Sequence, residues 1–93
     1  MIDRMKKPIH GDEITIRYNG ETVKATCCEV MEIPKRGPGA AKFTILSKSL
    51  FHNGGEAFLT HGPVETPLRV ERVTTMPHRR SSLVSFYGVF ELA

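Results

Sequence analysis

Basic residues in turn-rich segments are the feature of this sequence that most directly suggests chemistry. Lys35 and Arg36 lie in a segment with two prolines and two glycines, and His78, Arg79 and Arg80 follow another proline. Exposed cationic side chains of this kind neutralise phosphates and displace counterions from a nucleic-acid backbone. Because loops at the same end of a small barrel converge, we expect both segments to form one nucleic-acid-binding surface.

Further residues could enlarge this surface. Four other cations are candidates to extend it: Arg17, Lys42, Lys48 and Arg69. Three aromatic residues could stack on bases if they are exposed: Tyr18, Phe51 and Tyr87. Charged pairs also simply keep loops solvated, so the pattern by itself leaves both interpretations open.

The sequence contains no recognisable catalytic pattern. No serine lies in a Gly-x-Ser-x-Gly motif, and neither a Walker loop nor a dinucleotide-binding glycine pattern occurs. The four histidines, His10, His52, His61 and His78, match no standard metal-ligand spacing. We therefore expect a protein that is not an enzyme and that uses no metal or other cofactor.

The two cysteines are adjacent, at Cys27 and Cys28. Neighbouring side chains on a strand point to opposite faces, so the two sulfurs should not bond to each other. Zinc motifs separate their paired cysteines by intervening residues, which argues against a metal thiolate pair. We expect ordinary strand cysteines without a catalytic role, in a reducing compartment.

Length and composition indicate one small globular domain. The chain has 93 residues, of which 40% are hydrophobic and 25% charged, with a formal net charge of +3. We expect a charged N-terminal lead-in over residues 1–10 and a single domain over residues 11–93. No apolar run approaches the ~20 residues of a membrane span, and the first residues lack the apolar region of a signal peptide. These features predict a cytoplasmic protein without membrane contacts.

A β-hairpin is expected near the start of the domain. Apolar and polar residues alternate over residues 13–18, at the period of a half-buried strand. Asn19-Gly20 then supplies two residues that readily adopt positive φ, as a type I′ turn requires. A long second strand follows over residues 21–33. A bulge near Cys27-Cys28 is expected within it, because without one Glu29 would face the core.

Four more strands are expected after the turn-rich segment at residues 34–39. The expected elements are strands at residues 40–47, 56–61, 68–75 and 83–92, a short helical turn at 48–51, and breaks at Gly62-Pro63 and Thr66-Pro67. The core expected from period-2 placement comprises Ile14, Ile16, Val23, Phe43, Ile45, Phe58, Val70, Val84, Phe86 and Phe90. The pattern predicts an all-β protein, a small antiparallel barrel of five or six strands.

One resemblance supports this fold class. The segment Gly11-Asp12-Glu13-Ile14-Thr15-Ile16, the Asn19-Gly20 turn and a long second strand ending at Val30 resemble the start of KOW and other SH3-like small barrels. The resemblance covers roughly 20 of the 93 residues. Lys24-Ala25-Thr26 stands where that group usually has a second glycine cluster. The resemblance implies an open barrel that binds RNA, DNA or the transcription and translation machinery.

Two functions remain open at this point. The first is a non-enzymatic nucleic-acid-binding barrel, an accessory factor of bacterial or phage origin that contacts DNA or RNA through its basic loops. The second is a protein-interaction module or inhibitor that docks on a larger cellular machine. The second is supported by the last strand, which is apolar on both faces, and by the acidic first hairpin. The last strand also fits a central position in the barrel, and both a monomer and a homodimer are compatible with the sequence.

Overall fold

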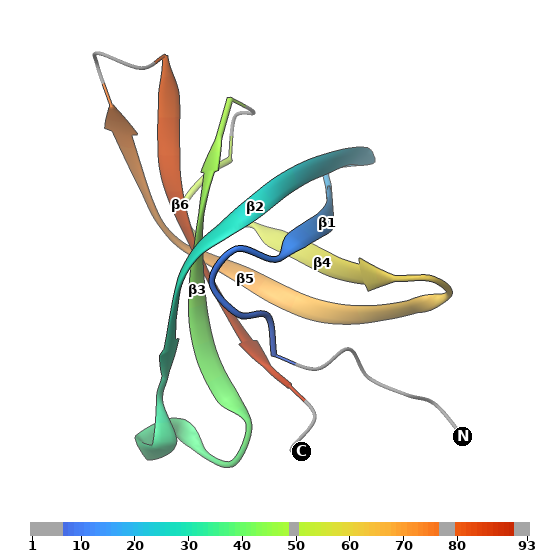
Figure 1. The fold of residues 1–93 in the computed structure, drawn as a ribbon, viewed down its shortest axis with the longest axis vertical. Coiled ribbons are helices and arrows are strands. Elements are labelled where there is room, and N and C mark those ends of the chain that lie inside the picture. Colours follow the sequence, from blue (N-terminus) through green and yellow to red (C-terminus); the bar gives the residue numbers. More distant parts are fainter. Residues whose placement is uncertain (1–6, 49–50, 77–79, 91–93) are drawn as a thin grey trace.

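The computed structural model describes residues 7–48, 51–76 and 80–90. The strands are β1 (Glu13–Tyr18), β2 (Glu21–Glu32), β3 (Ala40–Ser47), β4 (Glu56–His61), β5 (Val64–Met76) and β6 (Ser81–Val89), and a short 3₁₀ helix, η1 (Pro34–Arg36), lies between β2 and β3 (Figure 1). Within the described residues, no helix is long and apolar enough to cross a membrane.

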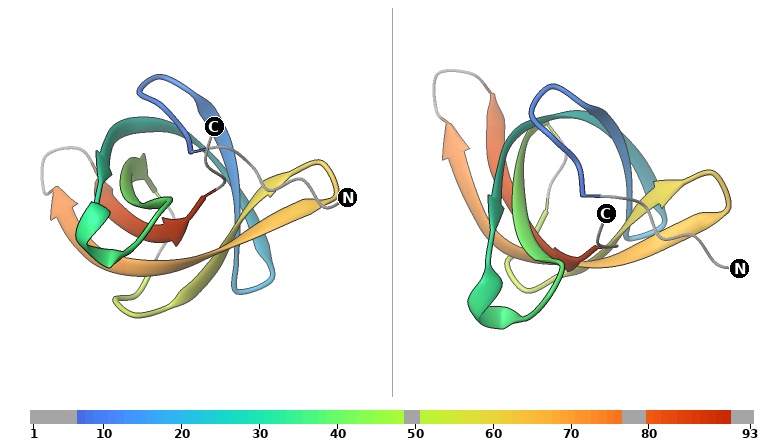
Figure 2. Two further views of the ribbon diagram at one scale, coloured as in Figure 1. Left: turned by 90° about the horizontal axis from the view of Figure 1, so that it is seen from below. Right: turned by 60° about the horizontal axis from the view of Figure 1, so that its bottom comes forward.

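The strands close into a barrel in the order β1-β2-β3-β6-β5-β4, and all neighbouring pairs are antiparallel. Pairing of β1 with β4, in which Ile16 lies opposite Leu59, completes the ring. Figure 2 shows the strands curving around the barrel interior. The expectation of a small all-β antiparallel barrel is therefore confirmed, with six strands. Closure leaves no strand at the edge of the sheet, which removes a common route to aggregation.

The first hairpin forms as its sequence predicts. Asn19 and Gly20 have φ values of 52° and 81°, and Tyr18 lies opposite Glu21 across the turn. Positive φ at both central residues is the signature of a type I′ turn, whose twist matches that of the flanking strands. The bounds of β1, β3 and β4 are also those expected from the alternation of apolar and polar residues.

The expected bulge in β2 is present. The register between β2 and β3 shifts between Cys27 and Glu29, so the bulge returns Val30 to the core and leaves Glu29 exposed. Cys27 is buried and Cys28 remains half-buried. Cys28 does not belong to the core cluster, so the bulge does not carry it into the barrel interior.

The expected break at Thr66-Pro67 is wrong, because β5 continues through it from Val64 to Met76. Pro67 lies opposite Phe58 of β4, while pairing of β5 with β6 begins only at Leu68. Proline is tolerated in a strand where one side is locally unpaired, since its missing N–H then removes no ladder bond. The last strand begins at Ser81, ahead of the expected residue 83, and ends at Val89, while the last residues of the expected strand, 91–92, lie outside the described residues. The expected helical turn at residues 48–51 falls partly outside the described residues.

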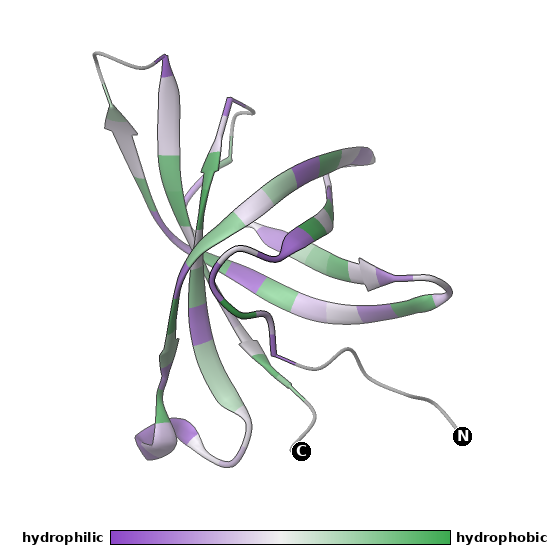
Figure 3. Cartoon of the chain, viewed as in Figure 1, coloured by the Kyte–Doolittle hydropathy of each residue, from purple (hydrophilic) through white to green (hydrophobic). Residues whose placement is uncertain are grey.

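The core fills the interior of the barrel. Apolar and polar residues alternate along the strands, so that one side of each strand faces inward (Figure 3). Phe43 stacks on Phe86 with ring centroids 5.3 Å apart, and Phe51 meets Phe86 edge-on at 5.2 Å. The expected core residues that are buried are Ile14, Ile16, Phe43, Ile45, Val70, Val84, Phe86 and Phe90, while Val23 is half-buried against them.

Phe58 is the core prediction that is wrong. Its neighbours Ala57 and Leu59 are fully buried, and Phe58 points to the outer face of β4. Three consecutive apolar residues leave the phase of a strand ambiguous, and a change of one residue in phase moves every side chain to the other face. Here two aliphatic side chains fill the interior and the larger ring lies outside.

Candidate functional site

The basic residues that the sequence suggested lie in two separate connections. Lys35 and Arg36 belong to η1, and both are exposed. Arg80 is also exposed and directly precedes β6. His78 and Arg79 lie outside the described residues.

Lys35 and Arg36 lie at one end of the barrel and Arg80 at the other, so the structure does not bring these three residues together. In the pairing of β3 with β6, Ala40 lies opposite Val89 at one end and Ser47 opposite Ser82 at the other. The eight residues of β3 span about 23 Å at the rise of an extended strand. The β2–β3 connection adjoins the first end (Figure 1). Arg80 directly precedes β6 and therefore lies at the second end.

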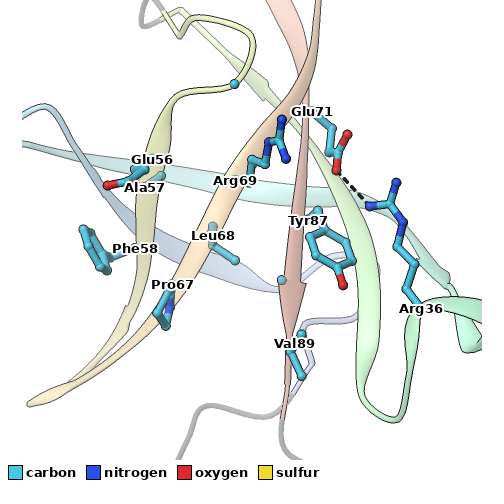
Figure 4. Close-up of a pocket in the computed structure, with 12 residues that line it drawn as sticks. Arg36, Glu56, Ala57, Phe58, Pro67, Leu68, Arg69, Glu71, Tyr87 and Val89 are labelled. Atoms are coloured by element: carbon cyan, nitrogen blue, oxygen red, sulfur yellow. Dashed lines mark hydrogen bonds and ion pairs between the residues drawn. The ribbon is translucent and has the colours of Figure 1, made fainter.

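A groove on the outer face of β4, β5 and β6 brings together a different set of side chains. It is an open depression of about 760 Å³, comparable in volume to small-molecule sites. Apolar and charged side chains both contribute to its lining, among them Phe58, Pro67, Tyr87, Val89, Arg36 and Arg69 (Figure 4). Arg36 is the only described residue of the two basic segments that reaches the groove, and the suggested Arg69 and Tyr87 line it as well.

Arg36 is held over Tyr87 by a carboxylate from β5. Its guanidinium carbon lies 4.8 Å from the centroid of the Tyr87 ring, and Nη1 donates a hydrogen bond of 3.0 Å to Glu71 Oε1. Glu71 occupies a bulge, since the register of β5 with β6 shifts between Val70 and Arg72. Bulges of this kind re-aim side chains, and this one directs the Glu71 carboxylate toward Arg36 across β6.

A second guanidinium lies over the aromatic ring on β4. The guanidinium carbon of Arg17 is 4.7 Å from the centroid of the Phe58 ring, and Arg17 lies opposite Phe58 in the pairing of β1 with β4. Glu65 of β5 accepts a hydrogen bond of 2.9 Å from Arg17 Nε. The outer face thus carries two units of the same composition, each with a glutamate of β5, an arginine and an aromatic ring.

Cations also lie beside Tyr87 along the cross-strand row that contains it. Tyr87 of β6 lies opposite Arg69 of β5 on one side and opposite Lys42 of β3 on the other. Residues directly opposite one another in an antiparallel pair share a face of the sheet. Arg69 is exposed and Lys42 half-buried, and neither forms an ion pair within the described ranges. Glu56 of β4 lies opposite Arg69 on the other side but forms no ion pair with it, so both cations can still contact an anionic partner.

Two of the aromatic residues suggested for stacking are occupied elsewhere. Phe51 is buried in the core, and the half-buried Tyr18 packs on it with ring centroids 4.6 Å apart. The Tyr18 hydroxyl accepts a hydrogen bond from the backbone N–H of His52. Tyr87 and Phe58 are the aromatic rings that line the groove. The outward position of Phe58 follows from its two aliphatic neighbours, Ala57 and Leu59, which occupy the interior.

The titratable groups outside the groove include two whose pKa values are shifted, Cys27 and Glu32. No three or more side chains of histidine, cysteine, aspartate or glutamate in the described part of the chain are grouped to hold a metal ion. Burial raises the pKa of the Cys27 thiol. The hydrogen bond and charge of Lys7 lower the pKa of the exposed Glu32. These shifts have structural causes, and neither group lies in the groove.

Comparison of the chain with protein-family models, with curated proteins and with solved structures gives no significant match.

Proposed function

We propose that this protein is a non-enzymatic nucleic-acid-binding barrel whose interface is the outer face of β3, β6, β5 and β4. The observation that carries the proposal is the row in which Lys42, Tyr87 and Arg69 stand side by side on three adjacent strands. A strip of cations interleaved with an aromatic ring is the composition that barrel proteins use to hold a nucleic-acid backbone. The positive net charge of +3 favours the same class of partner.

The cations of this row differ from ordinary solvated charges in their position in the fold. Arg69 and Lys42 project from strands and not from loop tips, so the barrel fixes the separation between them. Preorganised cations lose less conformational freedom on binding than cations on mobile segments. Arg36 reaches the same face from the β2–β3 connection (Figure 4). The originally suggested Lys35 lies next to it in sequence and is exposed, so it can extend the strip toward that end of the barrel.

The first test compares binding of a fluorescent oligonucleotide across a salt series. The parent protein should lose affinity steeply as salt rises, because each phosphate contact releases counterions. The double variant Lys42→Gln, Arg69→Gln should bind more weakly and should flatten the slope of log affinity against log salt by about 1.4 for a single strand. Fluorescence anisotropy gives both quantities.

The matched control removes the same charge from other places. Lys24→Gln with Lys48→Gln removes two exposed lysines, one on the β1–β2 hairpin and one just beyond β3. This control should bind more tightly than the interface variant and should retain a steeper salt slope. Equal losses of affinity for the oligonucleotide in the two double variants would show non-specific attraction between charges and refute this interface. Absence of binding at low salt would refute the proposed function itself.

Docking on another protein is the alternative, and exposed apolar residues support it. Met31 lies opposite Lys42 at one end of the row and is 58% exposed, and Val89 beside the groove is 41% exposed. Exposed apolar side chains at the margin of a groove are common in protein interfaces. If the oligonucleotide test fails, this surface becomes the first place to seek a protein partner.

A further inference from the structure

We propose that the groove takes the unpaired bases of a single strand, so that the protein prefers single-stranded nucleic acid to a duplex. This inference rests on the proposed function and adds the form of the nucleic acid. It follows from the two units that combine a glutamate, an arginine and an aromatic ring, and from the cation that lies between them.

Each unit presents planar surfaces to a ligand. In one, the Arg36 guanidinium lies 4.8 Å from the Tyr87 ring centroid, and in the other Arg17 lies 4.7 Å from that of Phe58. Unpaired bases stack on aromatic rings and also on guanidinium planes. The ion pairs with Glu71 and Glu65 hold both arginines in place before any ligand arrives. The two units are therefore prepared stacking sites.

The spacing of the two units indicates a ligand longer than one nucleotide. Phe58 and Tyr87 lie two strands apart and on adjacent outer rows, which puts their Cα atoms about 12 Å apart. One base cannot cover both rings. Arg69 lies on β5, between the strands that carry them, and forms no ion pair within the described residues. A strand with a base at each unit would place its intervening phosphates near Arg69.

The charge balance of the groove favours bases over phosphates alone. Glu56 and Glu71 line it together with Arg36 and Arg69, so its formal charges cancel. A site that only clamped a duplex backbone would be better served by cations without these carboxylates. Apolar lining from Phe58, Pro67 and Tyr87 suits the faces of bases, which a duplex hides within its own stack.

Tyrosine fluorescence offers a direct probe of this contact. The chain has no tryptophan and only two tyrosines, Tyr18 and Tyr87. Titration with an unlabelled single-stranded oligonucleotide should quench the emission, and the quenching should persist in Tyr18→Phe. It should disappear in Tyr87→Phe, which should still bind because phenylalanine also stacks. Loss of the quenching in Tyr18→Phe alone would place the base away from the groove and overturn the inference.

Affinities of the aromatic variants complete the test. Tyr87→Leu and Phe58→Leu should each weaken single-strand binding about tenfold or more while leaving the salt slope unchanged. Each of these two variants should weaken duplex binding much less than single-strand binding, and a mononucleotide should bind far more weakly than the oligonucleotide to the parent protein. Thermal melting of each variant checks that it is folded.

The outcomes separate this inference from the proposed function. Salt-dependent binding that requires Arg69 and Lys42, but is equal for single strand and duplex and unaffected by both leucine variants, would keep the function and refute the base-binding groove. A mononucleotide that binds as tightly as the oligonucleotide would also refute it, since it would indicate a nucleotide site and not a path for a strand. Absence of all binding would refute both proposals.

Discussion

Single side chains on the outer face act through the neighbours that hold them. Arg36 and Arg17 each bond to a glutamate of β5 and lie over an aromatic ring. Exposed ion pairs of this kind add at most about 1 kcal/mol to stability. Their main effect is to restrict long side chains to one orientation, which lowers the entropy lost when a ligand binds. Replacing either arginine should therefore affect binding more than folding.

The adjacent thiols should differ sharply in reactivity. Burial shields the Cys27 sulfur and raises its pKa, whereas Cys28 is half-buried. At about pH 8, near the ordinary thiol pKa, iodoacetamide should modify Cys28 first, and Cys27 should react only on unfolding. Peptide mass spectrometry identifies the site. Similar modification of both thiols in the folded protein would contradict the burial of Cys27.

The raised pKa of Cys27 also predicts how stability changes with pH. The pKa of Cys27 is higher in the folded state than in the unfolded state. The thiol therefore contributes fully to the free energy of unfolding below its unfolded-state pKa, and this contribution is lost as pH rises through its folded-state pKa. Between about pH 8 and pH 10, around the ordinary thiol pKa, Cys27→Val should therefore lose less stability than the parent. Urea unfolding at the two pH values measures the difference. A steeper loss in Cys27→Val would reverse the expected sign.

At the scale of elements, the β2–β3 connection ends at Gly39, whose backbone lies close against the backbone of Phe90. Gly39 has a φ of +78°, and its carbonyl accepts a 2.8 Å hydrogen bond from the N–H of Phe90. A Cβ at this position would lie 2.2 Å from the carbonyl oxygen of Phe90. The connection that carries Arg36 is thereby fixed against the end of β6.

Gly39→Ala should destabilise the protein by about 2 kcal/mol or more, through the positive φ and the backbone clash together. Gly54→Ala is the matched control, because Gly54 has the same φ of +78° but nothing within 4 Å of an added Cβ. Urea unfolding should show the larger loss for Gly39→Ala. Equal losses would mean that the backbone relieves the clash at Phe90 without cost.

At the scale of the whole molecule, stability rests on one core inside the barrel, to which every strand contributes. Phe86 is fully buried and touches both Phe43 and Phe51, so it links residues far apart in the chain. Most of the apolar contacts therefore form only when the barrel closes. A domain of this size has little stability in reserve, so loss of one central side chain is a large fraction of the total.

Phe86→Ala should cost about 3–5 kcal/mol, the usual range for a buried phenylalanine. Phe58→Ala should cost much less, because Phe58 lies on the outer face and its removal leaves no cavity in the barrel. Thermal or urea unfolding of the two variants distinguishes the inner from the outer face of the sheet. Comparable losses would indicate that Phe58 packs in the core after all.

The strands could be predicted from the sequence because their signals are local. Alternation over β1, the positive φ of Asn19-Gly20 and the proline and glycine content after β2 each depend on residues next to one another. Even the bulge at Cys27 followed from neighbours, because an unshifted register would bury Glu29. Local sterics and side-chain periodicity thus determined an all-β chain and most of its strand boundaries.

The candidate site could not be predicted in the same way, because its residues meet only through pairing between distant strands. Pairing of β3 with β6 separates the β2–β3 connection from Arg80, and pairing of β5 with β6 places Arg69 beside Tyr87. The outward phase of Phe58 likewise depends on which side of β4 the closed barrel makes its interior. Sequence alone determined which segments extend and where they turn. Barrel closure decided which side chains become neighbours, because strand order and register minimise the free energy of the whole sheet and not of any one segment.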